Sequence, residues 1–125
     1  MTVDPTQPYD SDNIFAKILR GEVPCNKVYE DDHALAFHDV NPQADVHILV
    51  VPKGAYVSWD DFSAKASESE IAGFVRAVGH VAREQGLVVR GYRLLGNVGR
   101  NGGQEVPHLH VHLFGGGPLG PMLPR

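Results

Sequence analysis

The stretch His108-Leu109-His110-Val111-His112-Leu113-Phe114 decides how the C-terminal part of this 125-residue chain folds. Histidines and apolar residues alternate in it, and successive side chains of a β-strand point to opposite faces of a sheet. The alternation therefore predicts a strand whose leucine and valine side chains face the core, while its three histidines share the other face. Three of the chain's seven histidines fall within five positions, which indicates a functional row.

A row of imidazoles suits two kinds of chemistry. Neighbouring histidines of the row lie about 6.6 Å apart along a strand, so two of them could share a zinc ion with another ligand, such as His47 or Asp39. His108 and His112 lie about 13 Å apart, too far for all three rings to hold one tetrahedral ion. Neutral imidazole can instead attack phosphorus without a separate base. We favour this second interpretation, which needs neither a metal nor a cofactor.

Glycines gather in the turn that precedes this row, over residues 98–105 (Val-Gly-Arg-Asn-Gly-Gly-Gln-Glu). Glycine adopts backbone conformations that let the chain approach a ligand closely. Backbone N–H groups in such a turn can point at an anion, and Gly99, Gly102 and Gly103 are predicted to do so here. The turn and the histidine row together predict a site for a phosphate-containing ligand.

Hydrophobic periodicity predicts two helices farther from this site. The first is expected over residues 14–19, with Ser11 as its N-cap. The second follows the capping-box pattern of Ser67 and Glu70, carries an apolar stripe and stops at Gly86. Strands are predicted over residues 28–30, 34–38, 46–51, 92–97 and 108–114, and residues 53–66 are expected to be irregular.

This order of elements lacks the regular alternation of strands and helices that is typical of a parallel sheet. It predicts an α+β fold with a mainly antiparallel five-stranded sheet and two helices. We expect residues 1–10 to be a flexible lead-in and residues 11–125 to form a single domain.

Composition narrows the class of protein further. The formal net charge is −4 with no basic stripe, which argues against binding to a nucleic-acid backbone. Cys25 is the only cysteine, so an internal disulfide and a four-cysteine zinc site are both excluded. The N-terminal residues lack the apolar stretch of a signal peptide, and no segment is apolar for long enough to span a membrane. We therefore expect a cytoplasmic protein without a membrane partner.

The histidine row resembles the signature of the histidine-triad (HIT) family, in which three histidines alternate with apolar residues. The run from Asn97 through Gly102-Gly103-Gln104 to His112, followed by Gly115-Gly116, is similar to the Hint-type branch of nucleotide-binding proteins. Further similar segments are residues 14–22, 35–42, 47–53 and 118–123, so the likeness covers nearly everything from residue 11 onward. The resemblance implies a HIT-like α+β meander fold, a homodimer with a continuous sheet, and binding of purine mononucleotides.

The resemblance also implies roles for individual residues. His110 would be the nucleophile and His112 a phosphate contact, while His108, with His47 nearby, would orient the active ring. Asp39 would hold the ribose hydroxyls. The other implied nucleotide contacts are His38 and Val40 at the base, Asn97 and Gln104 at the sugar–phosphate and leaving side, and Gly103, Glu105 and Val106 around them.

The chain departs from some relatives at two positions. Many carry a histidine after the Pro-Lys pair at residues 52–53, where this chain has Gly54-Ala55-Tyr56. Some relatives have a serine where this chain has Glu105. The Glu105 carboxylate would either position an amine leaving group or be solvated.

The leading functional hypothesis is a purine nucleoside phosphoramidase. In it His110 displaces an amine from a nucleoside 5′-phosphoramidate, and water then releases the nucleoside monophosphate from a nucleotidyl-histidine intermediate. Two alternatives stay open at this point: hydrolysis of dinucleoside polyphosphates, against which the glycine- and proline-rich tail over residues 118–122 argues, and a regulatory nucleotide-binding protein whose catalysis is incidental.

Overall fold

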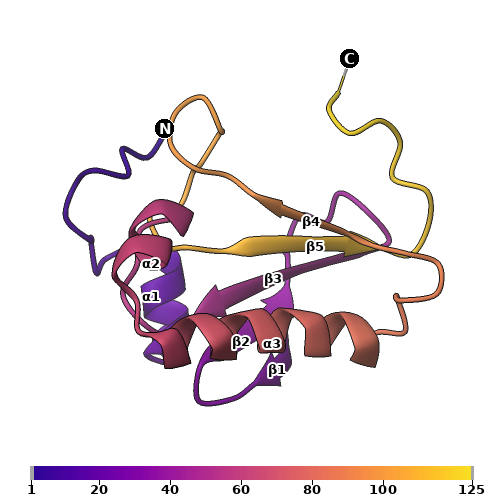
Figure 1. Cartoon of the computed structure of the whole chain (residues 1–125), viewed down its shortest axis with the longest axis horizontal. Coiled ribbons are helices and arrows are strands. Elements are labelled where there is room, and N and C mark those ends of the chain that lie inside the picture. Colours follow the sequence, from indigo (N-terminus) through magenta and orange to yellow (C-terminus); the bar gives the residue numbers. More distant parts are fainter. Residues whose placement is uncertain (1, 125) are drawn as a thin grey trace.

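The computed structural model describes residues 2–124 and is built around one antiparallel sheet of five strands (Figure 1). The strands are β1 (Lys27–Glu30), β2 (Ala34–His38), β3 (Val46–Pro52), β4 (Arg93–Gly96) and β5 (Val111–Gly115), and the helices are α1 (Ile14–Leu19), α2 (Trp59–Lys65) and α3 (Glu68–Glu84). The strand order is β1-β2-β3-β5-β4, so β5 lies between β3 and β4. The predicted α+β class and five-stranded antiparallel sheet are confirmed.

Helix α3 covers one face of the sheet (Figure 1). The predicted capping box is present, because the Ser67 hydroxyl accepts the Glu70 N–H and the Glu70 carboxylate accepts the Ser67 N–H. The apolar stripe of the helix is buried at Phe74, Ala77, Val78, Val81 and Ala82. It packs with inward-facing residues of the strands, including Ile48, Val50, Val111 and Leu113, to form the larger core cluster.

The opposite face of the sheet packs against α1 and carries the histidines. A smaller apolar cluster lies there, made of Phe15, Leu35, Phe37, Leu49 and Val51. Because side chains alternate along a strand, Leu109, Val111 and Leu113 join the α3 core while their neighbours point to the α1 face. The sequence pattern predicted this division of the row into an apolar face and a histidine face.

Three local predictions were wrong. The segment predicted to be irregular contains α2, which begins at a second capping box formed by Ser58 and Asp61. The N-cap of α1 is Asn13 and not Ser11, since the Asn13 side chain accepts the Ala16 N–H. The last strand begins only at Val111.

The late start of β5 has a clear cause. The Leu109 N–H donates to the Tyr56 carbonyl, 2.8 Å away, and so is not available to the ladder with β3. His108 therefore lies in a bend and His110 in the short segment just before the strand, and only His112 belongs to β5. Among residues 2–124, no helix combines the length and apolar composition that crossing a membrane requires.

Candidate active site

A cavity of about 660 Å³ opens between α1 and the histidine face of the sheet. Nine of the predicted site residues line it: His38, Asp39, Val40, Asn97, Gly103, Glu105, Val106, His110 and His112. The rest of its wall includes apolar side chains from α1, β2 and β3, namely Ile14, Phe15, Ile18, Phe37 and Leu49. The three other predicted residues, His47, His108 and Gln104, are buried and outside this lining.

His110 presents a nitrogen lone pair. Its Nδ1 lies 2.7 Å from the backbone carbonyl oxygen of His108, which can only accept a hydrogen bond. Nδ1 must therefore carry the proton, and Nε2 of the neutral ring keeps its lone pair. Burial lowers the pKa of His110, which keeps the ring neutral at pH 7. The Phe15 ring packs edge-on against it at 4.9 Å between centroids.

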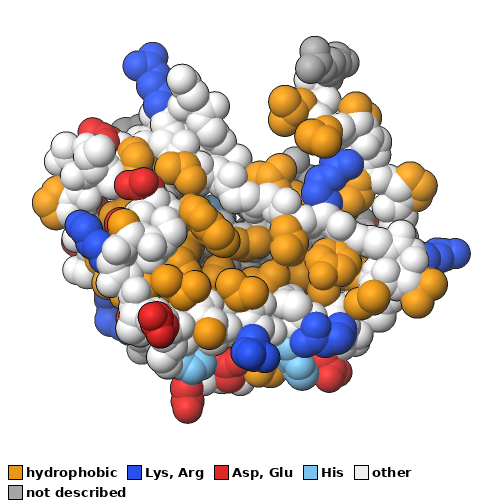
Figure 2. Space-filling model, in the orientation of Figure 1, with side chains coloured by type: hydrophobic (Ala, Val, Ile, Leu, Met, Phe, Trp, Pro, Cys, Tyr) orange, Lys and Arg blue, Asp and Glu red, His pale blue; other side chains and the backbone are white. Residues whose placement is uncertain are grey.

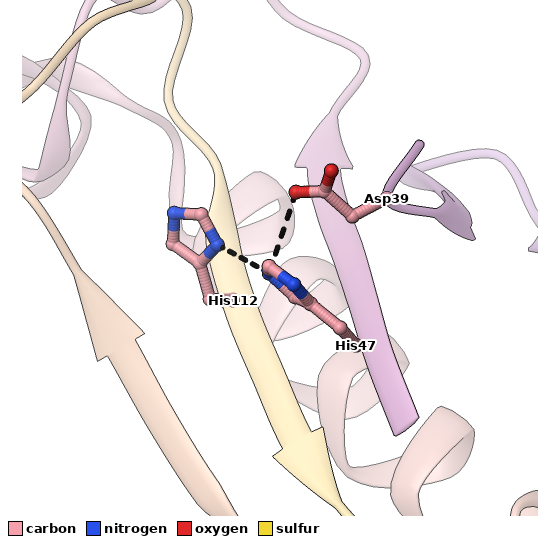
Figure 3. A group of neighbouring side chains, drawn as sticks. All are labelled: Asp39, His47 and His112. Carbon is pink, nitrogen blue, oxygen red and sulfur yellow. Dashed lines mark hydrogen bonds and ion pairs between the residues drawn. The ribbon is translucent and has the colours of Figure 1, made fainter. Parts of the chain in front are cut away.

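His112 has the opposite proton placement, and His47 sets it (Figure 3). The Gln43 N–H donates to His47 Nδ1 at 3.1 Å, so the neutral His47 ring carries its proton on Nε2. That nitrogen is 2.9 Å from His112 Nδ1, which accepts the bond, and 3.4 Å from Asp39 Oδ2. His112 is left with an N–H at Nε2, a donor suited to an anion.

The surroundings of these rings keep them uncharged. Burial lowers the pKa of His47, although the Asp39 carboxylate opposes that shift. Burial, aided by the neighbouring His110 and His47, lowers the pKa of His112 to about 4. At neutral pH the cavity wall therefore holds a lone pair on His110 and an N–H on His112, on rings whose centroids are 5.1 Å apart.

The same proton placement argues against the metal site that the sequence left open. The ligand atoms of Asp39, His47 and His112 lie within 4.8 Å of one another, close enough to surround an ion. To bind a metal, however, His47 Nε2 would have to release its proton, and the neutral ring would then carry it on Nδ1. That proton would face the N–H of Gln43, so the donor set fits a hydrogen-bonded relay and not a metal centre.

His108 lies behind the cavity wall and is fully buried. Its Nε2 is 2.9 Å from the carbonyl oxygen of Pro52, and its Nδ1 is 2.5 Å from the hydroxyl of Tyr9. Burial lowers its pKa to about 4. Sequence reasoning missed Tyr9, because that residue lies 99 positions away and belongs to no motif.

The N–H groups of the glycine turn were predicted to point at an anion, but two of them bond within the turn. The Gly99 N–H donates to the Gln104 side chain, and the Gly103 N–H donates to the Arg100 carbonyl oxygen. The Gln104 amide also donates to the carbonyls of Val57 and Val106. The Gly99 and Gly103 N–H groups thus stabilise the turn and do not point into the cavity. Gln104 is buried and supports the turn without lining the cavity.

The wall of the cavity carries negative charge. Asp39 Oδ1 accepts the Asn41 N–H at 2.8 Å, which fixes the carboxylate beside the relay. Glu105 adds a second carboxylate to the wall, and Asn97 lies nearby with its amide bonded to the Gly102 carbonyl. Among the described residues that line the cavity, none is lysine or arginine. The donors available to an anion in this cavity are therefore the histidines, side-chain amides and backbone N–H groups.

Comparison with known proteins identifies the family. The HIT domain family model matches residues 20–119. A HIT-like protein from Azospirillum brasilense is 64% identical over 117 residues, covering 94% of this chain and 96% of its own length. The purine nucleoside phosphoramidase of Escherichia coli K12 is 45% identical over 112 residues, covering 90% and 93%.

Solved structures give the same result. A histidine triad protein from Clostridium difficile superposes with a TM-score of 0.83 at 42% identity, covering 93% of this chain and all of that one. The match of the family model over most of the chain, the identity to full-length relatives and the shared fold agree with the resemblance seen in the sequence. The chain belongs to the HIT domain family.

Proposed function

We propose that this protein is a purine nucleoside phosphoramidase, which hydrolyses the phosphorus–nitrogen bond of a nucleoside 5′-phosphoramidate. One observation carries the proposal: the lone pair of His110 lies beside the N–H of His112 on the wall of one cavity. In this proposal the lone pair of His110 serves as the nucleophile and the N–H of His112 as the oxyanion donor. The name of the 45% identical Escherichia coli relative supports the same activity.

The reaction follows from these proton positions. His110 Nε2 attacks phosphorus, the phosphorus–nitrogen bond of the substrate breaks, and the amine leaves with a proton taken up from solvent. The nucleotidylated His110 ring is cationic, and its Nδ1–H keeps its bond to the His108 carbonyl oxygen, which stabilises that charge. Water then attacks phosphorus and gives up a proton to solvent, the bond to Nε2 breaks, and the nucleoside monophosphate and neutral His110 are released.

The remaining lining suits a nucleoside. The Asp39 carboxylate accepts hydrogen bonds and can hold the two ribose hydroxyls. Ile14, Ile18 and Phe37 provide an apolar slot for a flat base, with His38 and Val40 at its open side. In this proposal Glu105, which also lines the cavity, serves the leaving-group end, where a carboxylate favours an amine.

The charge of the cavity disfavours hydrolysis of dinucleoside polyphosphates. A polyphosphate chain carries several negative charges and is usually bound by lysine, arginine or a metal ion. The described lining has no such cation and includes Asp39 and Glu105. A phosphoramidate monoester carries a single negative charge, which histidine donors can accommodate.

Release of AMP from adenosine 5′-phosphoramidate tests the function. We expect turnover by the wild type and a loss of about three orders of magnitude or more in His110→Ala, since that change removes the nucleophile. His80→Ala is the matched control, because His80 lies on α3 away from the cavity and should leave the rate unchanged. A His110→Ala variant that keeps most of the wild-type rate would sink the assignment. Tight AMP binding without turnover by the wild type would favour the regulatory alternative.

A second copy of this chain is the partner we propose for the β4 edge of the sheet. β4 is an edge strand, paired with β5 alone among the described strands. Beside it lies an apolar groove of about 610 Å³ that α3 also lines. Its exposed side chains are Trp59, Val75, Tyr92, Leu94 and Val98, each 37–56% exposed, and Figure 2 shows how hydrophobic side chains gather on this face. Pairing of two β4 edges would continue the sheet and cover both grooves.

A further inference from the structure

We propose that Tyr9 is a positioning residue for His110, and that it acts through His108; this rests on the phosphoramidase function proposed above. Tyr9 precedes α1 and lies far from the histidine row in sequence. Its hydroxyl contacts His108 Nδ1 at 2.5 Å, and the two rings pack edge-on with centroids 5.6 Å apart. It therefore makes both a polar and an apolar contact with the first histidine of the triad.

The direction of the hydrogen bond follows from the other side of the ring. His108 Nε2 faces the Pro52 carbonyl oxygen at 2.9 Å, which can only accept, so the proton lies on Nε2. Nδ1 then has only its lone pair, and the Tyr9 hydroxyl must be the donor. Burial raises the pKa of Tyr9, which keeps the phenol protonated and able to donate. The His108 ring is thus held at both nitrogens, by Pro52 and by Tyr9.

His108 passes this restraint to the nucleophile through its backbone. The carbonyl of His108 accepts the Nδ1–H of His110, so its position determines where the His110 ring points. Phe15 packs against both rings, with centroids 4.9 Å from His110 and 6.5 Å from His108. A His108 ring that lost its Tyr9 partner would have a buried acceptor without a donor, and it would gain freedom to tilt.

The N-terminal segment is anchored well enough to do this. The Val3 N–H donates to the Gln104 carbonyl oxygen at 3.0 Å, which ties the segment to the closed glycine turn. Beyond Tyr9, the Asp10 carbonyl accepts the Asn13 side-chain N–H at 2.7 Å at the start of α1. Tyr9 thus lies between two fixed points, and the segment reaches the site at His108 and at the turn.

Tyr9→Phe tests the proposal because it removes one hydroxyl and keeps the ring. We expect kcat for adenosine 5′-phosphoramidate to fall about tenfold, in the range typical of residues that orient an active group, with KM and AMP affinity unchanged. Tyr29→Phe is the matched control, since its hydroxyl donates to Asp31 away from the cavity. An unchanged kcat in Tyr9→Phe would overturn the proposal. So would a loss of kcat that is matched by an equal loss of AMP affinity, because that would indicate a general structural effect.

A measurement without substrate separates this proposal from the proposed function. Long-range ¹H–¹⁵N spectra of histidine-labelled protein should show His108 with its proton on Nε2 and a hydrogen-bonded Nδ1. In Tyr9→Phe the Nδ1 resonance should move toward that of a free lone pair, while Tyr29→Phe leaves it in place. A wild-type His108 that carries its proton on Nδ1 contradicts the proposal, even if the variant does not fold. If the wild type releases no AMP but these shifts appear, the phosphoramidase assignment alone is lost.

Discussion

Two different hydrogen-bond partners distinguish His110 from His112, the two triad histidines that line the cavity. The Gln43 N–H fixes the proton of His47, and His47 in turn fixes that of His112. The His108 carbonyl fixes the proton of His110 in the opposite sense. Two chemically identical side chains therefore act as a lone-pair donor and as a hydrogen-bond donor, although both are neutral.

Keeping these rings neutral makes the stability of the protein depend on pH. The pKa values of His108 and His112 are about 4 in the folded protein, and the ordinary value is 6.5. Between these values the unfolded chain binds more protons than the folded one, so the free energy of unfolding falls as the pH is lowered. Full stability is present above pH about 6.5, and each such histidine contributes a slope of up to about 1.4 kcal/mol per pH unit.

Urea unfolding at a series of pH values between about 7.5 and 4.5 measures this slope. His80→Ala should show the wild-type slope, because His80 lies at the surface beside Glu84. The interpretation fails if wild-type stability is flat from pH about 6.5 to 5.

At this scale the sequence predicts the residues that lie within a motif. The histidine row, Asp39 and the cavity-lining neighbours follow from alternation and from the family signature, and nine predicted residues meet at one cavity. Tyr9 and Gln43 could not be found in this way, because one acts across 99 positions and the other through its backbone N–H. The burial of Gln104 could not be predicted either, because it depends on hydrogen bonds that form only when the turn packs against Val57.

Strands β3 and β5 bring the hydrogen-bonded pair His47 and His112 together. They pair antiparallel with His112 opposite Leu49 and His47 opposite Phe114. Residues that lie opposite each other share a face, so this register places both imidazoles on the α1 face together with Leu49 and Phe114. The alternate pairs, Ile48 with Leu113 and Val50 with Val111, point into the core under α3. The strand register thus determines which side chains meet at the site, and the turn over residues 98–105 forms part of the cavity wall.

The closed turn gives a prediction of its own. A Cβ atom at Gly102 would overlap with the backbone of Val98, so Gly102→Ala should force the turn open. We expect a loss of about 1–3 kcal/mol in the free energy of unfolding. AMP affinity should weaken too, since the Gly102 carbonyl holds the Asn97 side chain at the cavity.

Thermal unfolding and AMP titration check this pair of effects. Gly117→Ala is the control, because a Cβ there has only an ordinary contact at 3.7 Å with Asp45. Equal behaviour of the two alanine variants would show that the turn is not rigid.

Elements with strong local signals were predictable, and those set by distant contacts were not. The Ser67 capping box and the stripe of α3 need no tertiary information. Helix α2 also has a local signal, at Ser58 and Asp61, but its apolar stripe is too short to stand out. The start of β5 depends on the bond between Leu109 and Tyr56, which local periodicity does not contain.

For the whole molecule, the exposed groove beside β4 leads to a prediction about assembly. Leu94 is 49% exposed in that groove, and a charge there would be buried without a partner if two copies met at this edge. We expect the wild type to elute as a dimer and Leu94→Glu as a monomer, measured by size-exclusion chromatography with light scattering. Val89→Glu is the control, since Val89 is 99% exposed and outside the groove. A monomeric wild type would contradict the proposed assembly.

The sequence predicted the architecture of the whole molecule, but the groove beside β4 could not be predicted from it. The α+β class follows from the order of the elements, whereas an edge strand and its apolar surroundings appear only when β4 is placed beyond β5. Leu94, Val75 and Trp59 come from three separate elements, so no window of sequence contains the patch.

Leu95 lies between the proposed dimer edge and the proposed active site. Leu95 lines both the histidine cavity and the groove beside β4, and it pairs directly with His112 in the sheet. Anything that clamps β4 from outside would thereby stiffen the inner lining as well. In the proposed dimer, contacts at the edge of the sheet would thus reach the cavity through a strand that supplies none of the reacting atoms.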